Sequence, residues 1–415
     1  MNPARALLVA VCVATTSGRA ADEFFDRVES ALSVSAADAR VRFHLSGLLD
    51  LEGYEFQRPA PMLLQARGDS LLEPRLTVFL DGQIGPGLYV FAQARADRGF
   101  DPAQESVRPR LDEYALRWTP WKDGRLRLQA GKFATIVGNW AVRHGSWVNP
   151  FITAPLPYEY LTGLWDNEAV RSAPTLLQWA HVRPGLPAAL TAVEKRLRIP
   201  LLWGPSYTIG AAAFGEVRRV QYAFEVKHAA LSSRPTVWSN WDEFHDHPTV
   251  NGRLGYRPSA MWDFGVSASA GTYLHPVATR SLAPRHGRAD YKQVMFGQDV
   301  SFAWRHLQLW SEVYVARFEI PMVADAKTVA YYVEAKYKLT PQFSAALRWN
   351  EQLFATIPER LRATAWGHDV WRIDVAPAYR FTPHTQLKLQ YSLQHGDSGS
   401  RDFTRIVAAQ ATVRF

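Results

Sequence analysis

The chain has 415 residues, with 47% apolar and 13% aromatic side chains and a formal net charge of +8. This composition is that of a folded protein, so it excludes a disordered or collagen-like chain. The length allows two or three soluble domains or one large β-domain.

The first twenty residues have the pattern of a secretory signal peptide. Arg5 provides the positive start, residues 6–14 are apolar, and the sequence GRA at 18–20 offers a cleavage site between small residues. We therefore expect residues 1–20 to be removed. Residues 6–14 are too few to act as a membrane anchor, because a bilayer core of about 30 Å needs about 20 residues. Cleavage would remove Cys12, the single cysteine, and with it any disulfide or thiolate metal site.

Residues 22–36 are the only stretch with convincing helical periodicity. Their apolar side chains recur at helical spacing, with acidic residues between them: Phe24, Phe25, Val28 and Leu32. We expect a helical segment over 21–40 that precedes the main domain at 41–415.

From Val41 onward the period of the apolar residues changes to two, as in a strand with one apolar face. The alternation recurs at 41–53, 75–83, 220–228, 262–274, 329–339, 343–349 and 386–394. Segments of about ten residues with two distinct faces are typical of a transmembrane β-barrel. After residue 20 no stretch is long and apolar enough for a membrane helix, so a membrane-embedded fold would have to be a closed barrel.

Short and long connectors alternate along this region. The short ones lie at 84–87, 119–124, 214–219, 257–261, 304–306, 339–342 and 381–384. The long ones lie near 53–73, 97–110, 135–204, 231–247, 274–290, 319–327, 355–366 and 396–402. In outer-membrane barrels the short turns face the periplasm and the long loops face outward. The pattern predicts an all-β antiparallel barrel of sixteen strands. A further hairpin within 174–195 would make eighteen, but its poor alternation favours a short helix and a turn.

Two stretches carry a resemblance to a known family. The sequence RLDEYALRWTPWKDGRLRLQAGKFATIVG at 110–138 and the final VRF resemble the sixteen-stranded bacterial porins, most closely the phosphate-selective type and related porin-like barrels. In that family a strand ending in GKF leads into a loop that folds into the pore. The terminal Phe415 is similar to the C-terminal aromatic residue that the barrel-insertion machinery recognises. The chain lacks the dense ladder of arginines that the phosphate-selective members carry.

The long segment 135–204 is the most informative irregular region, because structureless stretches of this length are uncommon unless they are functional. We interpret it as the constriction loop of a porin, and the alternative is a lid on the outer rim. Its candidate pore residues are Arg143, His144 and Arg171.

Basic residues also recur on the strand faces that are predicted to line the lumen. The candidates there are Arg253, Arg348, Arg372 and Lys388. Rings of basic side chains favour anions in a pore, and a low-dielectric wall strengthens their field. Acidic residues share these faces, so the alternative is that the charges pair with one another.

Motifs for other functions are absent from the sequence. No GxSxG, HExxH or Walker sequence occurs, so we expect no enzyme and no cofactor. The histidines and acids of 238–248 are neighbours in one loop, which favours a solvated loop over a metal site. The basic residues do not form a nucleic-acid patch.

The predicted function is a passive outer-membrane porin with mild anion preference, in contact with lipid and lipopolysaccharide and, by analogy, a homotrimer. The alternative is a plugged structural or adhesive barrel.

Overall fold

The computed structural model describes residues 18–36, 40–56, 62–66, 68–100, 106–180, 195–239, 247–359, 362–396 and 403–415. Most of the expected signal peptide lies outside these described residues, and so does the acidic and histidine-rich run at 240–246.

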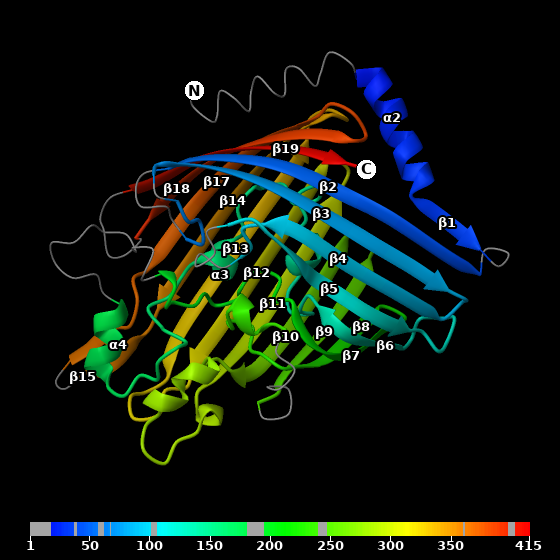
Figure 1. Cartoon of the computed structure of the whole chain (residues 1–415). Helices are drawn as coiled ribbons and strands as arrows, with labels where there is room; N and C mark the ends of the chain where they lie inside the picture. The colour runs from blue at the N-terminus through cyan, green and yellow to red at the C-terminus, as the bar shows by residue number, and fades with distance from the viewer. Residues whose placement is uncertain are drawn as a thin grey trace.

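Sixteen antiparallel strands form one closed barrel (Figure 1). In chain order they are β2 (Val41–Phe56), β3 (Ser70–Ile84), β4 (Leu88–Asp97), β5 (Arg108–Trp118), β6 (Arg127–Phe133), β7 (Thr208–Val217), β8 (Val220–Lys227), β9 (Thr249–Ser259), β10 (Trp262–Thr272), β11 (Lys292–Trp304), β12 (Leu307–Phe318), β13 (Ala326–Lys338), β14 (Phe343–Phe354), β17 (Val370–Arg380), β18 (Thr385–His395) and β19 (Phe403–Arg414). Each strand pairs with its neighbour in the sequence, and β19 closes the barrel against β2. The prediction of sixteen strands is confirmed, and the alternative of eighteen is wrong.

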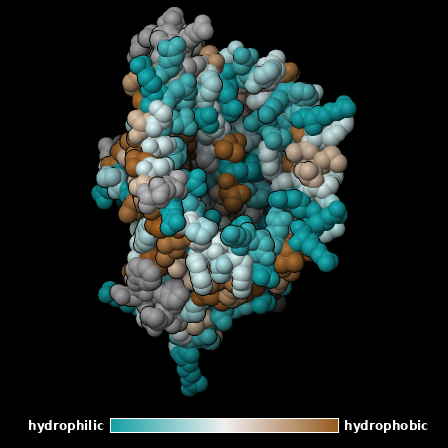
Figure 2. Space-filling model, turned by 90° about the vertical axis from the view of Figure 1, so that its right-hand side faces the viewer, coloured by the Kyte–Doolittle hydropathy of each residue, from teal (hydrophilic) through white to brown (hydrophobic). Residues whose placement is uncertain are grey.

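The two faces of the strands are as the alternation predicts. Alternate side chains such as Leu76, Val266 and Val333 are exposed on the outside and apolar. Their neighbours in sequence point inward and are largely polar, among them Thr77 and Glu334. Figure 2 shows a hollow rimmed mainly by hydrophilic residues. An apolar outer band around a polar interior is the arrangement of a transmembrane barrel.

The connectors divide the barrel into two ends. The predicted short connectors are all tight turns at one end, here called the turn end, on the right of Figure 1. The long connectors gather at the opposite loop end. They contain the short elements η1 (Ala141–Arg143), α3 (Leu156–Glu159), α4 (Ala173–Ala180), η2 (Pro235–Val237), η3 (Pro276–Ser281), η4 (Arg288–Asp290) and the hairpin β15 (Thr356–Glu359) and β16 (Arg362–Ala365). The helix expected within 174–195 is therefore present as α4.

The N-terminal segment differs from its prediction in one part. A helix, α2, runs over Gly18–Ala31, but Ser33–Ala36 form a short strand, β1, instead of the last turn of the predicted helix. β1 pairs antiparallel with residues 41–44 of β2, so sheet hydrogen bonds replace helical ones there. No helix among the described residues has the length and apolar character needed to cross a bilayer.

The seam of the barrel is completed from both ends of the chain. β19 pairs with β2 from Phe56 down to Leu48, and the backbone of Phe415 exchanges two hydrogen bonds with Gly47, of 2.8 and 3.1 Å. β1 continues along the same edge of β2 beyond the C-terminus. The Phe415 ring lies directly over Gly47, where a Cβ atom would overlap it. The last residue is therefore fixed by the sheet and by its side chain together.

Substitution of Gly47 tests this seam. Gly47→Val should displace the Phe415 ring and destabilise the barrel by about 1–3 kcal/mol, the usual cost of overpacking. Thermal unfolding in detergent, followed by circular dichroism, measures the shift. Gly252→Val is the matched control, because nothing lies within 4 Å of a Cβ at that strand position. Equal midpoints for the two variants would contradict the role of Phe415.

Candidate functional site

The interior of the barrel holds much of the long connection between β6 and β7, whose described residues, 134–180 and 195–207, are here called the lumen loop. β6 is only seven residues long, so the chain leaves the wall early and turns into the lumen. Gly138 makes this turn at φ +73°, with the Tyr314 hydroxyl and the Glu312 carboxylate packed against its Cα. A larger residue at position 138 would meet both a strained backbone and a filled space.

Glu312 on β12 holds the lumen loop at two separated points. Its carboxylate accepts hydrogen bonds from the backbone N–H groups of Asn139 and Trp140, the latter at 2.8 Å. It also accepts a hydrogen bond of 2.7 Å from the Tyr158 hydroxyl on α3. Glu312 is completely buried. A buried carboxylate is costly without partners, so this side chain and the loop depend on each other.

Arginines on the facing strands form a second set of anchors. Arg348 on β14 donates to the carbonyl oxygens of Thr153 and Ala154 at 3.0 and 3.2 Å, and it pairs with Asp374 at 2.8 Å. Arg372 on β17 pairs with the same Asp374 at 3.0 Å and with Glu159 of the loop at 2.5 Å. Both arginine side chains are completely buried. Their charge is neutralised locally and does not face open solvent.

Two further basic side chains, Arg143 and Lys388, hold residues 143–149 of the loop. Arg143 pairs with Glu334 on β13 at 2.6 Å. Lys388 on β18 donates to the carbonyl oxygens of Ser146 and Asn149 at 2.7 and 3.0 Å. The wall residues of these contacts lie on β12, β13, β14, β17 and β18, so they hold this part of the loop against that side of the lumen.

The structure places the seven predicted pore residues in four kinds of position. Four of them anchor the lumen loop, as described above: Arg143, Arg348, Arg372 and Lys388. Arg253 pairs with Asp299 across the lumen wall at 2.6 Å, and His144 lines a cavity. Arg171 lies at the loop end, where it donates to the carbonyl oxygens of Ser281 and Leu282.

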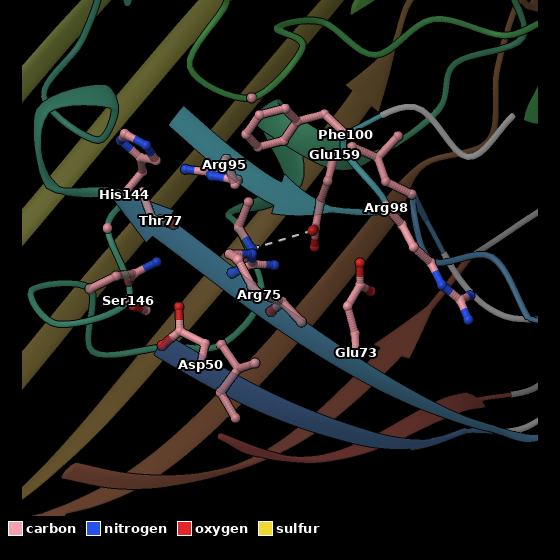
Figure 3. A pocket seen from close by; sticks show the side chains of 18 of the residues that line it. Asp50, Glu73, Arg75, Thr77, Arg95, Arg98, Phe100, His144, Ser146 and Glu159 are labelled. Atoms are coloured by element: carbon pink, nitrogen blue, oxygen red, sulfur yellow. Dashed lines mark hydrogen bonds between the residues drawn. The ribbon is translucent and has the colours of Figure 1, made fainter. Parts of the chain in front are cut away.

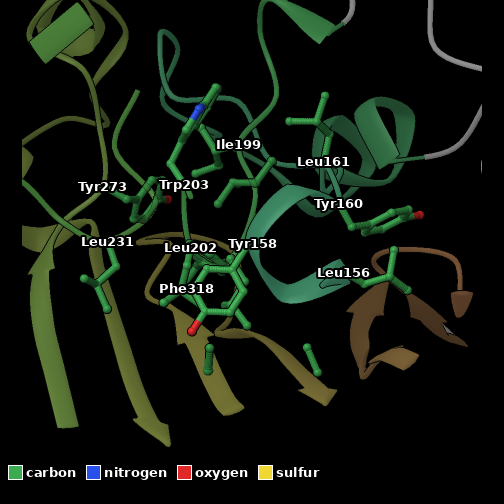
Figure 4. Close-up of a cluster of buried hydrophobic side chains, with 14 of the residues drawn as sticks. Leu156, Tyr158, Tyr160, Leu161, Ile199, Leu202, Trp203, Leu231, Tyr273 and Phe318 are labelled. Carbon is green, nitrogen blue, oxygen red and sulfur yellow. The ribbon is translucent and has the colours of Figure 1, made fainter. Parts of the chain in front are cut away.

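Behind the anchors, the lumen loop builds an apolar core inside the loop end of the barrel. Figure 4 shows Leu156, Ile199 and Trp203 of the loop packed with Leu231 and with Phe318 of the wall. The described members of this cluster are almost fully buried. Burying each large apolar side chain contributes about 1.5–3 kcal/mol. The loop is therefore a folded plug that occupies part of the lumen, with α3 at its centre.

Two cavities remain along the opposite wall. The first, of about 200 Å³, lies between the lumen loop and β2, β3 and β4 (Figure 3). The second, of about 620 Å³, extends toward the turn end and is bounded by β4 to β12. Residues that are neighbours on the same element line different cavities. On β4, Gln93 borders the first cavity and Phe91 the second, and in the lumen loop His144 borders the first and Arg143 the second. The two cavities are therefore neighbours along this wall.

The sequence reasoning missed two arginines on the wall of the first cavity. Arg75 on β3 pairs with Glu52 and Asp97, both at 2.8 Å, and Arg95 on β4 pairs with Asp112 at 3.2 Å. Both line the first cavity. The period-two alternation of 75–83 already puts Arg75 on the face of Thr77, and the same alternation applied to 89–97 would have put Arg95 on the inward face.

His144 carries no charge into this cavity at ordinary pH. Burial lowers the pKa of His144 to about 3, and the positive charge of Arg95 adds to the decrease. Its two ring nitrogens lie 2.5 Å from the Ala141 carbonyl oxygen and from the Tyr207 hydroxyl. The charge of the first cavity therefore comes from its arginines and acids alone.

Comparisons with known proteins support the barrel architecture. OmpT of Vibrio cholerae superposes with a TM-score of 0.54 at 10% identity, over 92% of this chain and 99% of that one. OmpF of Salmonella typhi, in complex with daunomycin, gives 0.54 at 12% identity over 92% and 100%. An anion-selective porin from Comamonas acidovorans gives 0.53 at 11% identity over 90% and 100%. No family model matches the chain, and no curated protein does. The chain thus has the fold of outer-membrane porins.

Removal of one anchor tests how the lumen loop is held. Lys388→Met removes the donor to the Asn149 carbonyl and leaves the Ser146 carbonyl with a long hydrogen bond of 3.4 Å from Gln386. A buried group that loses its partner costs about 1–3 kcal/mol. Hydrogen exchange in the peptide 141–150 should become at least about tenfold faster. Lys338→Met is the control, because the Lys338 side chain is exposed and makes no hydrogen bond or ion pair with any described residue. Unchanged exchange in Lys388→Met would show that the apolar core alone holds the loop.

Proposed function

We propose that the chain is an outer-membrane diffusion channel for small hydrophilic solutes, with mild anion preference. The succession of two cavities between the lumen loop and the wall of β2 to β12 carries this proposal. In this orientation the loop end faces the exterior and the turn end faces the periplasm, as in other outer-membrane barrels. The lumen loop then sets the constriction, because it leaves the narrower cavity along the path.

The anion preference rests on cations near the turn end. Lys336 and Lys338 on β13 form no ion pair with any described residue. Arg380 and Arg414 each lie over the Trp147 ring, at 4.7 and 4.9 Å, and also have no acidic partner among the described residues. Unneutralised cations at a channel mouth raise the local concentration of anions. These residues, and not the buried anchors, supply the proposed preference.

A plugged structural barrel is the second candidate. The buried apolar core of the lumen loop favours it, since that core would have to unfold before the loop could leave the lumen. Such a barrel would conduct no ions even though its wall is that of a porin.

Assembly and partners follow from the same proposal. One of the solved OmpT structures of Vibrio cholerae is described as a trimer form, and we propose a homotrimer in the outer membrane here as well. Lipid and lipopolysaccharide would contact the outer band, and the insertion machinery would recognise Phe415.

Single-channel recording in planar bilayers separates the two candidates. A diffusion channel gives discrete current steps, smaller than those of an unobstructed sixteen-stranded barrel because the plug narrows the path. Protein that inserts without producing steps would instead support the plugged barrel.

Reversal potentials in a salt gradient test the anion preference. The double variant Lys336→Gln and Lys338→Gln should lower the anion-to-cation permeability ratio about twofold or more, since two unpaired charges are removed at the mouth. Lys327→Gln on the same strand is the control, because Lys327 is exposed on the outward face. Equal ratios for the double variant and the control would assign the selectivity to other residues.

A further inference from the structure

One acidic side chain in the first cavity has no hydrogen-bond or ion-pair partner within 4 Å in the part of the chain that the structure describes. Glu73 on β3 lines the cavity and is 8% exposed, yet among the described residues its carboxylate makes no hydrogen bond and no ion pair within 4 Å. The other two carboxylates of the lining are satisfied. Asp50 accepts from the Thr412 hydroxyl at 2.6 Å, and Glu159 pairs with Arg372. A buried carboxylate without a partner is costly, so Glu73 is a site where a ligand cation would be stabilised.

A basic side chain of the same cavity also has no acidic group of the described residues within ion-pair distance. The guanidinium of Arg98, just beyond β4, donates to the carbonyl oxygen of Gln65 at 3.2 Å and has no acidic partner within 4 Å in the described chain. Figure 3 shows Glu73 and Arg98 on the same side of the cavity. Arg75 and Arg95, by contrast, are each held by acids of the wall. Free charges of both signs therefore line one small space.

The rest of the lining is partly apolar. Leu63 and Leu64 approach from the β2–β3 connection, Phe100 from the β4–β5 connection, and Ile152 from the lumen loop. The volume is about 200 Å³. An engineered cavity of about 150 Å³ in another protein holds benzene, so this space suits a body the size of an amino-acid side chain.

We propose that this cavity is a binding subsite for small zwitterions with an apolar body, namely apolar amino acids or their dipeptides. The ammonium group would lie against Glu73 and the carboxylate against Arg98, while the apolar body would contact Phe100 and the two leucines. The subsite deepens the proposed channel function and rests on it, because it lies on the path that solutes would follow.

Calorimetric titration of the detergent-solubilised full chain tests binding without requiring conduction. The probes are L-leucine and L-leucyl-L-leucine, with 4-methylpentanoate as the acid-only analogue of leucine and 3-methylbutylamine as its amine-only analogue. At least one zwitterion should bind about tenfold more tightly than either analogue, since each analogue forfeits one charge-assisted contact. Heat signals equal to those of buffer for both zwitterions would overturn the subsite.

Paired variants assign the two ends of the ligand. Glu73→Gln should weaken binding of the zwitterion and of the amine about tenfold and leave the acid unchanged. Arg98→Gln should weaken binding of the zwitterion and of the acid about tenfold and leave the amine unchanged. Glu168→Gln and Arg108→Gln are the controls, because both residues are exposed and line neither cavity. Variants that behave like these controls would overturn the assignment.

The channel and the subsite can fail separately. Current steps in bilayers without measurable zwitterion binding would overturn the subsite and leave the channel. Zwitterion binding without current steps would overturn the channel and leave a ligand-binding barrel.

Discussion

The structure depends on the requirement that every strand edge inside a membrane be paired, because hydrocarbon offers no hydrogen-bond partners. The edge of β2 is where this requirement is hardest to meet, since both ends of the chain arrive there. β19 pairs with residues 48–56 of this edge, Phe415 pairs with Gly47, and β1 pairs with residues 41–44. Because the closed wall separates its inward face from the lipid, that face can carry charged side chains. The positions of these charges determine where the lumen loop is held.

The charges divide the lumen into two unlike halves. On the side of β12 to β18, buried groups such as Glu312 and Arg348 hold the lumen loop through backbone carbonyl and N–H groups. A buried ion pair gains little by itself, but removing one partner is expensive, so these contacts fix the position of the loop more than they add to stability. On the side of β2 to β5, charges such as Arg75 and Arg95 pair with acids of the wall itself and border the first cavity. In the proposed channel, the loop would determine which half of the wall a solute can meet.

The sequence predicted the barrel well because its signals are local. Alternation and connector length can be read within ten or fifteen residues, and both gave the correct strand number and ends. The strand at Ser33–Ala36 was assigned to a helix because four residues are too few to distinguish the two periods. The roles of the inward charges were not predictable in the same way. Lys388 does face inward, but its partner Ser146 is 242 positions away, and no periodicity indicates which inward charges a distant loop will cover.

The same reasoning explains why the predicted pore residues differ from the residues of the proposed channel mouth and subsite. An arginine that anchors a loop is neutralised by carbonyl groups and acids, so it contributes little field to a passage beside it. Charges that lack such partners keep their field. Among the described residues these include Glu73 and Arg98 in the first cavity and Lys336, Lys338, Arg380 and Arg414 near the turn end. A solute entering from the loop end would therefore meet a site with both signs of charge first and a basic mouth last. That order favours recognition at the entrance and weak charge selection at the exit.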